Sequence, residues 1–430
     1  MAASRIAVIG AGLAGLSAAT DLARQGYTVD VYERSRLLGG RATSFEMDGV
    51  EVDNGQHVFL GCCSELIGFV ERAGMSAHVK LQPRFDAQVF ARGRGHSRLR
   101  AAGLPAPWHL LASFAGYRHL RWDSKLRVAH ALSRAHDAAH STGSFAGWLD
   151  RTGQTEDSLR GFWRPFFVPA LNAPLDEVSA ADAAFVMATA FLSGADSARF
   201  GYTTVPLAHV ARAAASSLHG VHLSTAIAGL EFSRDGLRAT ALHTADGVAI
   251  PCDGVVLAVT PPQLARFAAV HERLGVGPLD GFVPHAIVDV HLWHDRGPLG
   301  FDFAALLDAP VQWIFEKADG YLCASMSAAD QWIGKPTASI IEACWREATA
   351  AIEALRGATL VRSAVTRSPD ATFTARASAR RPGPATAMTN VAIAGSWTDT
   401  GWPDTMESAV RSGSAAARHL ARSLEGSRVA

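Results

Sequence analysis

Six residues near the N-terminus have the glycine spacing of a site that binds phosphate groups. They are Gly10-Ala11-Gly12-Leu13-Ala14-Gly15. In this pattern the first glycine makes a tight turn, the second lets the backbone approach a pyrophosphate, and the third lets a helix pack closely on a strand. Glu33 follows about 20 residues later, where a carboxylate can accept hydrogen bonds from ribose hydroxyls. The pattern therefore predicts a dinucleotide site.

A strand, a helix and a second strand must position these residues. Residues 5–9 are a short run with β-branched members, residues 13–24 are rich in Ala and Leu, and residues 28–33 alternate in polarity. We expect a βαβ unit in which the start of the helix directs its amides and its positive dipole at the phosphates. A glycine-rich turn without a ligand is the alternative, and the complete strand–helix–strand context argues against it.

The composition excludes several classes of protein. Of the 430 residues 48% are hydrophobic, which argues against a disordered chain, and 40 basic residues are balanced by 40 acidic ones, which argues against nucleic-acid binding. The length suggests two or three folding units. The five cysteines lack a CxxC pair, so we expect no disulfide framework, no metal and a cytoplasmic location.

A second glycine pair follows Glu33 closely. Residues 34–41 read Arg-Ser-Arg-Leu-Leu-Gly-Gly-Arg, and NAD-dependent dehydrogenases require no such element. The stretch resembles the glycine-pair motif of the FAD-dependent amine oxidase and phytoene desaturase superfamily. Residues 253–261 resemble a second superfamily motif, and residues 394–397 with 406–413 resemble its C-terminal flavin motif. The resemblance spans nearly the whole chain and implies FAD as the cofactor.

The resemblance also implies how the chain is divided. We expect an α/β fold with a Rossmann-type FAD-binding domain built from residues 1–80, 206–280 and 385–430. An inserted α+β substrate domain would be helical over residues 81–205 and a sheet over residues 281–384.

The cofactor residues follow from the motifs and the resemblance together. They are Gly10, Gly12, Leu13, Ala14, Gly15, Glu33, Arg34, Gly39, Gly40, Arg41, Gly55, Gln56, His57, Ile227, Gly395, Ser396, Thr405, Met406 and Ala409. Ser396 departs from the superfamily, which usually has Asp after the Ala-Gly pair, although a hydroxyl can still bond to ribityl or phosphate oxygens. A helix that begins near Met406 would direct its first amides at the pyrimidine edge of the flavin and favour the reduced anion.

Residues 52–62 are the most specific local marker. They read Val-Asp-Asn-Gly-Gln-His-Val-Phe-Leu-Gly-Cys and resemble a motif of the hydroxysqualene dehydroxylases, a bacterial family of hopanoid synthesis. Residues 104–111, 161–166 and 169–172 agree with that family. The resemblance implies an enzyme that replaces the hydroxyl of a long apolar isoprenoid, hydroxysqualene, with hydrogen to give squalene. Reduced FAD would supply the hydride, and an external electron donor would reduce the FAD.

Gln56 and His57 are the catalytic candidates. An allylic hydroxyl leaves as water once it is protonated, and histidine titrates near neutral pH. His57 could therefore be the acid, but an imidazole that only hydrogen-bonds the cofactor or the backbone is an equally open interpretation. The aromatic residues between 108 and 167 would either line an apolar tunnel for the substrate or form ordinary core.

Two other functions stay open at this point. A carotenoid- or phytoene-type desaturase or a flavin amine oxidase would run the flavin in the oxidative direction, and one fold serves both directions. A prenyl-lipid binding protein of the same fold would need no redox chemistry, although the intact glycines and Glu33 count against it. Flavin absorbance of the pure protein would separate such a binder from the enzymes.

Two helical stretches have further interpretations. Residues 104–122 combine Leu, Trp, Phe and Tyr with basic residues, so they would either dock on the inner face of the cytoplasmic membrane or pack within the protein. His136 and His140 have the spacing of a helical metal pair, but no third ligand is evident nearby. We expect a solvated helix face there.

Overall fold

A five-stranded parallel sheet joins the N-terminal, central and C-terminal parts of the chain. The computed structural model describes residues 3–47, 49–376 and 379–429. In spatial order the strands are β10 (Gly220–His222), β2 (Thr28–Tyr32), β1 (Arg5–Ile9), β14 (Gly254–Leu257) and β20 (Val391–Ile393). All neighbours in this sheet are parallel. The predicted α/β fold with a Rossmann-type sheet is confirmed, and its loops after β1 and β2 lie at the edge where dinucleotides bind.

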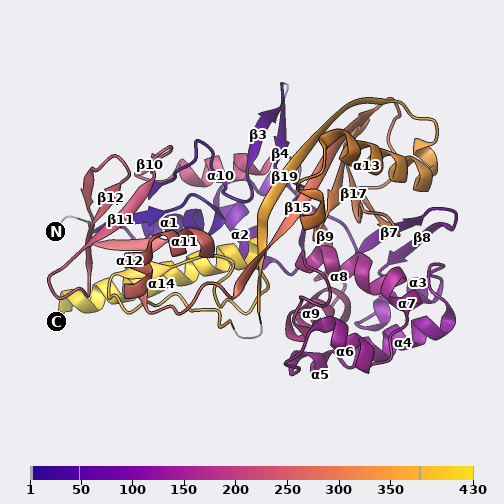
Figure 1. The fold of residues 1–430 in the computed structure, drawn as a ribbon, viewed down its shortest axis with the longest axis horizontal. Coiled ribbons are helices and arrows are strands. Elements are labelled where there is room, and N and C mark those ends of the chain that lie inside the picture. The colour runs from indigo at the N-terminus through magenta and orange to yellow at the C-terminus, as the bar shows by residue number, and fades with distance from the viewer. Residues whose placement is uncertain (1–2, 48, 377–378, 430) are drawn as a thin grey trace.

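Two layers cover this parallel sheet. On one face lie the helices α1 (Leu13–Arg24) and α14 (Met406–Val429), which pack on strand residues such as Val8, Val31 and Val256. On the other face lie a small antiparallel sheet and two short helices, namely β11 (Ile227–Phe232), β12 (Ala239–Thr244), β13 (Ala249–Pro251), α11 (Pro261–Arg266) and α12 (Ala268–Leu274). Figure 1 shows α14, in yellow, running along the same part of the molecule as α1.

A second, larger sheet belongs to the other part of the molecule. Its seven strands in spatial order are β19 (Leu360–Ala375), β15 (Phe282–His294), β18 (Tyr321–Met326), β17 (Trp313–Ala318), β16 (Phe303–Leu307), β7 (Asp86–Ala91) and β8 (Gly95–Arg100). One face packs on α13 (Thr337–Ala351) through Val288, Val290 and Leu292. The opposite face packs on the helices through Trp313, Phe315 and Cys323. Figure 1 shows that β15 and β19, the two longest strands of this sheet, extend from it toward the nucleotide-binding part.

Residues 86–100 differ from the helical expectation for this part of the chain. They form the hairpin β7–β8, and β7 pairs in parallel with β16 at the edge of the large sheet. The alternating burial of Asp86–Ala91 explains the strand, because every second side chain enters the core.

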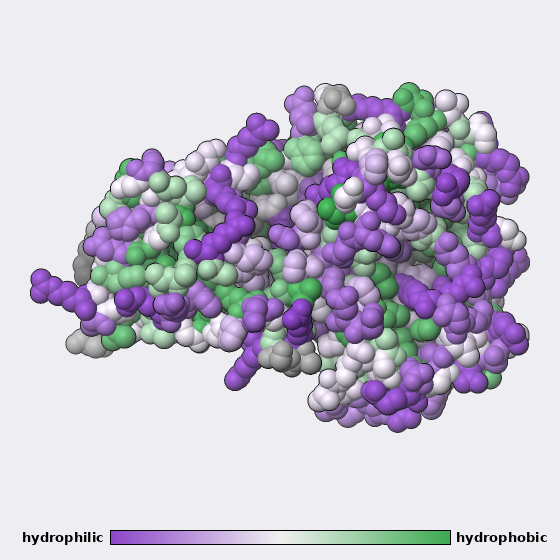
Figure 2. Space-filling model, in the orientation of Figure 1, coloured by the Kyte–Doolittle hydropathy of each residue, from purple (hydrophilic) through white to green (hydrophobic). Residues whose placement is uncertain are grey.

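Helices make up most of the region that follows. They are α3 (Leu111–Ala115), α4 (Trp122–Ser133), α5 (Ala135–Ala139), α6 (Phe145–Arg151), α7 (Glu156–Ser158), α8 (Arg164–Leu171) and α9 (Ala180–Val186). Their aromatic side chains form one buried cluster that includes Phe145, Trp163 and Phe167. The indole of Trp313 joins this cluster to the large sheet, since its N–H donates to the carbonyl of Pro165 at 3.0 Å. Figure 2 shows hydrophilic and hydrophobic residues interspersed over the face in view.

Several short elements pack on α1 and α14 or on one another. They are the hairpin β3 (Ser44–Met47) and β4 (Val50–Asp53), the strands β5 (Phe59–Leu60), β6 (Val79–Leu81) and β9 (Phe200–Thr203), and the helices α2 (Ser64–Arg72) and α10 (Leu207–Ala215). The loop between β4 and β5 contains residues 54–58 and lies against strand β15 of the large sheet. It brings the predicted catalytic candidates to the boundary of the two parts.

Candidate functional site

The turn after β1 has the backbone that the glycine motif predicts. Gly10 has a φ of +104°, and its amide donates to the carbonyl of Tyr32 at 2.8 Å. A Cβ on Gly15 would lie 1.9 Å from the carbonyl oxygen of Gly10, so only glycine allows α1 to begin this close to the strand. Gly12 is the N-cap of α1, and Leu13 and Ala14 lie in its first turn, whose amides have no acceptor within the helix.

The second glycine pair lies directly against the first motif. The amide of Gly39 donates to the carbonyl of Ala11 at 2.9 Å, and a Cβ on Gly40 would lie 2.9 Å from the Cα of Gly12. Gly39 and Gly40 both have positive φ angles. The two motifs thus form a cradle lined by backbone, with helix amides at one side. This geometry fits a pyrophosphate, which needs close backbone approach and N–H donors.

Glu33 stands at the end of β2 beside this cradle. One of its carboxylate oxygens accepts from the amide of Ala11 and the other from the amide of Ser35, both at 2.8 Å. These bonds fix the carboxylate next to the turn. Arg34, which is adjacent in sequence, is exposed to solvent.

Arg41 connects the glycine pair to the C-terminal motif. Its guanidinium donates to both carboxylate oxygens of Asp404, at 3.2 Å each, and to the hydroxyl of Ser396. It also lies over the ring of Phe373, 5.1 Å from the centroid. The hydroxyl at position 396 is therefore the acceptor of an arginine hydrogen bond, and a nearby carboxylate supplies the negative charge that the superfamily has in the motif itself.

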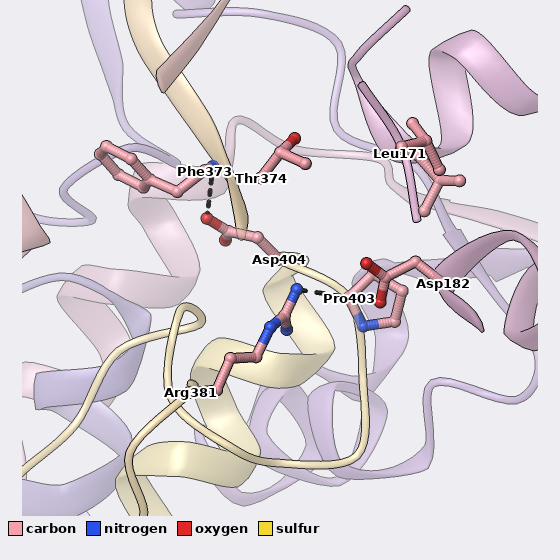
Figure 3. Close-up of a pocket in the computed structure, with 8 residues that line it drawn as sticks. Leu171, Asp182, Phe373, Thr374, Arg381, Pro403 and Asp404 are labelled. Atoms are coloured by element: carbon pink, nitrogen blue, oxygen red, sulfur yellow. Dashed lines mark hydrogen bonds and ion pairs between the residues drawn. The ribbon is translucent and has the colours of Figure 1, made fainter. Parts of the chain in front are cut away.

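Asp404 was not predicted from the sequence. Its side chain is 5% exposed and accepts from the amide of Phe373 at 2.7 Å, as Figure 3 shows. It also borders a small pocket with Leu171, Asp182 and Arg381, whose volume of about 10 Å³ holds roughly one water molecule. Asp404 precedes α14 by two residues, which is the signal that could have pointed to it.

The start of α14 is tied to α1. The hydroxyl of Ser17 donates to the carbonyl of Val410 at 3.0 Å, and Met406 packs on the same apolar cluster as Leu13. Thr405 accepts from the amide of Ser408 at 3.2 Å through its hydroxyl, while its carbonyl accepts from the amide of Ala409. Gly395 has a φ of +154° at the end of β20. The N-terminal ends of α1 and α14, which the sequence predicts to bind one cofactor, therefore pack against each other.

Ile227 follows a segment that is bonded to the end of β2, since the amide of Thr225 donates to the carbonyl of Glu33 at 2.8 Å. It is the first residue of β11, and its buried side chain packs in the core beneath the parallel sheet, in one cluster with Ile9 and Tyr32. A cofactor could therefore meet this residue through its backbone.

The loop after β4 orients His57. The side-chain amide of Asn54 donates to the carbonyl of Arg41, and its oxygen accepts from the amide of Thr43. The imidazole Nε2 of His57 lies 3.0 Å from that same oxygen, so it is the donor in the pair. Burial lowers the pKa of His57 below its usual value. The neutral imidazole has one N–H, and that N–H is bonded to Asn54.

Asp289 supports this loop from strand β15. Its carboxylate lies against Gly55, where a Cβ would come within 2.5 Å of Oδ2. Its Oδ1 accepts from the amide of Gln56 at 3.4 Å. Burial raises the pKa of Asp289 to about 6. Asp289 is the single carboxylate in β15, which was the sequence signal for this position.

Residues 3–47, 49–376 and 379–429 contain no group of three His, Cys, Asp or Glu side chains that could hold a metal ion. His136 and His140 are both exposed, with ring centroids 4.4 Å apart. Within the same described residues, no helix is long and apolar enough to cross a membrane.

The fold and the glycine cradle together define a flavoprotein of the dinucleotide-binding class. The chain matches the flavin-containing amine oxidoreductase family over residues 13–421, and it belongs to that family. It is therefore an FAD-dependent oxidoreductase, as the sequence predicted.

Relatives of known name agree with this assignment. The chain is 28% identical to a hydroxysqualene dehydroxylase of Rhodopseudomonas palustris, over 95% of this chain and 96% of that protein. It is 27% identical to one of Zymomonas mobilis, over 95% and 97%. A zeta-carotene desaturase of Synechocystis is 31% identical but covers 37% of this chain and 36% of its own length.

Solved structures share the fold. A putrescine oxidase superposes with a TM-score of 0.71 at 17% identity, covering 98% of this chain and 99% of its own. A cyclohexylamine oxidase from Brevibacterium oxydans superposes with a TM-score of 0.70 at 18% identity, covering 99% and 100%. These two likenesses establish the architecture alone.

Proposed function

We propose that this oxidoreductase removes the hydroxyl of hydroxysqualene reductively and yields squalene for hopanoid synthesis. The observation that carries the proposal is the extent of similarity. Hydroxysqualene dehydroxylases match 95% of the chain, including the part that packs around the large sheet, whereas the Synechocystis carotene desaturase matches 37%. A substrate-binding region that is similar along its whole length supports a similar substrate.

In this proposal the cofactor occupies the glycine cradle. The backbone at Gly12 and Gly40 and the first turn of α1 would hold the pyrophosphate, and Glu33 would exchange its bonds to backbone amides for bonds to ribose. The start of α14 at Met406 would face the flavin ring. When bound, reduced FAD supplies the hydride that replaces the hydroxyl.

The rest of the site must hold an apolar chain and keep water away. The face of the large sheet opposite α13 offers Trp313 and Phe315, which border the aromatic cluster of the helices. An isoprenoid bound along this face would bury its chain against aromatic rings, and burial of that surface would be the main source of affinity.

The test is anaerobic incubation of the protein, reduced and loaded with FAD, with hydroxysqualene. We expect squalene to appear in step with reoxidation of the flavin absorbance. Turnover of phytoene or of amines by the oxidised protein, with hydroxysqualene left intact, would instead assign the oxidative alternatives. A protein that takes up no FAD would favour a lipid-binding role.

We also propose that the molecule collects its substrate at a membrane surface. Five large hydrophobic side chains, here called the apolar patch, are more than half exposed: Leu104, Trp108, Leu111, Trp122 and Leu126. The ammonium of Lys125 donates to the carbonyl of Ala115 and lies over the ring of Trp122, so α3 and α4 are held side by side. Exposed Arg118 and Arg127 lie in the same segment, which suits an anionic lipid surface.

A further inference from the structure

The face of the large sheet beside Gln56 carries a buried polar cluster. Asp289 and Thr366 face each other across β15 and β19, and His291 lies two residues further along β15 on the same side. Asp289 and His291 are each 1% exposed, and Thr366 is 6% exposed. We call Gln56, Asp289, His291 and Thr366 the sheet-face cluster. Further across the same face lie the apolar side chains of Trp313 and Phe315, and buried polar groups need hydrogen-bond partners.

Three atoms of the sheet-face cluster have no hydrogen-bond partner among the described residues. They are Oε1 of Gln56, Nε2 of His291 and Oγ1 of Thr366, and all three atoms are buried. An unpartnered buried polar atom is costly, and three on one patch indicate a small polar ligand group with both donor and acceptor capacity. A hydroxyl has that capacity.

The apolar surroundings specify what carries this hydroxyl. Strands β17 and β18 continue the same face with Phe315 and Cys323, which belong to the aromatic core of the helical region. A ligand that fits is therefore an alcohol with a long hydrocarbon chain. This deepens the proposed function and rests on it.

We propose that the sheet-face cluster binds the substrate hydroxyl and that Asp289, in its carboxylic acid form, protonates it. The proton moves from the Asp289 carboxyl to the hydroxyl oxygen, and the C–O bond breaks with its electron pair leaving on water. Reduced FAD, when bound, would supply the hydride that neutralises the allylic cation and forms the new C–H bond, and the flavin would thereby lose two electrons. Asp289 regains its proton from solvent.

The geometry assigns the acid to Asp289 over His57. The N–H of neutral His57 is bonded to Asn54, so that imidazole has no proton to give at its buried position. Asp289 lies against Gly55 and contacts the loop of residues 54–58, whose Gly55, Gln56 and His57 are predicted to contact the cofactor. Burial raises its pKa to about 6, which keeps part of it protonated near neutral pH.

Charged and titratable groups surround this carboxyl. From the elements packed against it they are Asp53, His57, His291, Lys317, Tyr321, Cys323 and Cys344. The ammonium of Lys317 lies 3.6 Å from Asp53, so the nearest positive charge is paired with another carboxylate. Burial lowers the pKa of His291 to about 4, which leaves that imidazole neutral. Asp289 is thus free of a direct ion pair.

The first experiment measures single-turnover reoxidation of the reduced enzyme by hydroxysqualene as a function of pH. In the wild type the rate constant should be level below about pH 6 and fall about tenfold per pH unit above it, because only the protonated carboxyl can act. Asp289→Asn should lower the rate constant about 10²–10⁴-fold and remove this pH dependence. His57→Asn should keep the wild-type pH dependence.

Two readouts are independent of turnover. The oxidised wild-type protein should show an infrared band of a protonated carboxyl that titrates near pH 6 and is missing in Asp289→Asn. Intact hydroxysqualene should bind the oxidised protein more tightly than squalene does, and Thr366→Val should reduce that preference about five- to tenfold by removing one hydrogen bond. If Asp289→Asn does not fold, the wild-type infrared titration still tests for a protonated carboxyl, and the Thr366→Val binding data still test the hydroxyl site.

The outcomes separate the two proposals. A wild-type enzyme that makes no squalene overturns the proposed function, whatever the cluster binds. Squalene formation with a near-normal rate in Asp289→Asn, or with no carboxyl titrating near pH 6, overturns the role of Asp289 alone. Equal affinity for the alcohol and the hydrocarbon would show that the cluster holds only water.

Discussion

Single side chains compensate for a departure from the superfamily motif. Ser396 replaces the usual acid, yet the guanidinium of Arg41 still finds a carboxylate, because Asp404 lies within 3.2 Å of it. The two partners differ in burial, since the side chain of Asp404 is 5% exposed and that of Arg41 is 31% exposed. Removing the arginine would leave a buried charge without its partner.

Arg41→Ala should therefore lower the free energy of unfolding by about 3 kcal/mol and reduce the FAD content of the purified protein. The double variant Arg41→Ala with Asp404→Asn should recover a large part of the stability, because the unpaired charge is gone. Urea unfolding monitored by tryptophan fluorescence gives both values. As a control, Arg94→Ala removes an exposed partner of Asp308 and should cost less than about 1 kcal/mol. Equal losses for the two arginines would refute the buried-charge argument.

Packing between two helices sets the position of both helix ends at the proposed cofactor site. Gly413 of α14 lies on α1, where a Cβ would come within 2.2 Å of the carbonyl oxygen of Ala14 and 2.8 Å of the Cβ of Ser17. Ala14 belongs to the glycine motif, so a shift of α14 would move the C-terminal motif relative to the cradle.

Gly413→Ala should destabilise the fold by about 1–3 kcal/mol through overpacking, and it should weaken FAD binding. The matched control is Gly426→Ala in the same helix, where a Cβ meets nothing within 4 Å. There the better helix propensity of alanine should raise stability by up to about 1 kcal/mol. Thermal unfolding and flavin fluorescence on release measure both effects. A Gly413→Ala protein as stable as the wild type would show that the helices can separate without consequence.

The whole molecule divides into a nucleotide-binding part and a sheet-plus-helix part, and the apolar patch lies at the helical end, away from the parallel sheet (Figure 1). A lipid substrate must leave a bilayer before it reaches the large sheet. An apolar surface with basic neighbours on the helical part would place that part, rather than the nucleotide-binding part, against the membrane.

Trp108→Glu combined with Leu111→Glu should reduce binding to anionic liposomes about tenfold or more, measured by flotation, since two half-exposed apolar anchors are lost. Turnover of detergent-solubilised substrate should change little. The control is Leu237→Glu with Val248→Glu, which alters two residues of similar exposure in the turns that connect β11, β12 and β13. Unchanged flotation of the Trp108 and Leu111 variant would rule out the apolar patch as the docking surface.

Local sequence was sufficient for the fold class, the cofactor and the family, because each depends on motifs whose residues are close together in the chain. Backbone requirements that only certain residue types satisfy explain three features. They are the turn at Gly10, the close contact of Gly12 with Gly40, and the hydrogen bond of Glu33 at the end of β2. Which residues bind FAD remains a prediction.

Hydrogen bonds between residues far apart in the sequence could be identified only from the tertiary structure. Arg41 and Asp404 are 363 residues apart, and Gln56 and Asp289 are 233 apart. A local pattern predicts which side of a strand a residue faces, but it carries no information about what the opposite element places there. The acidity of Asp289 depends on burial between that strand and a distant loop, so only the assembled fold reveals it.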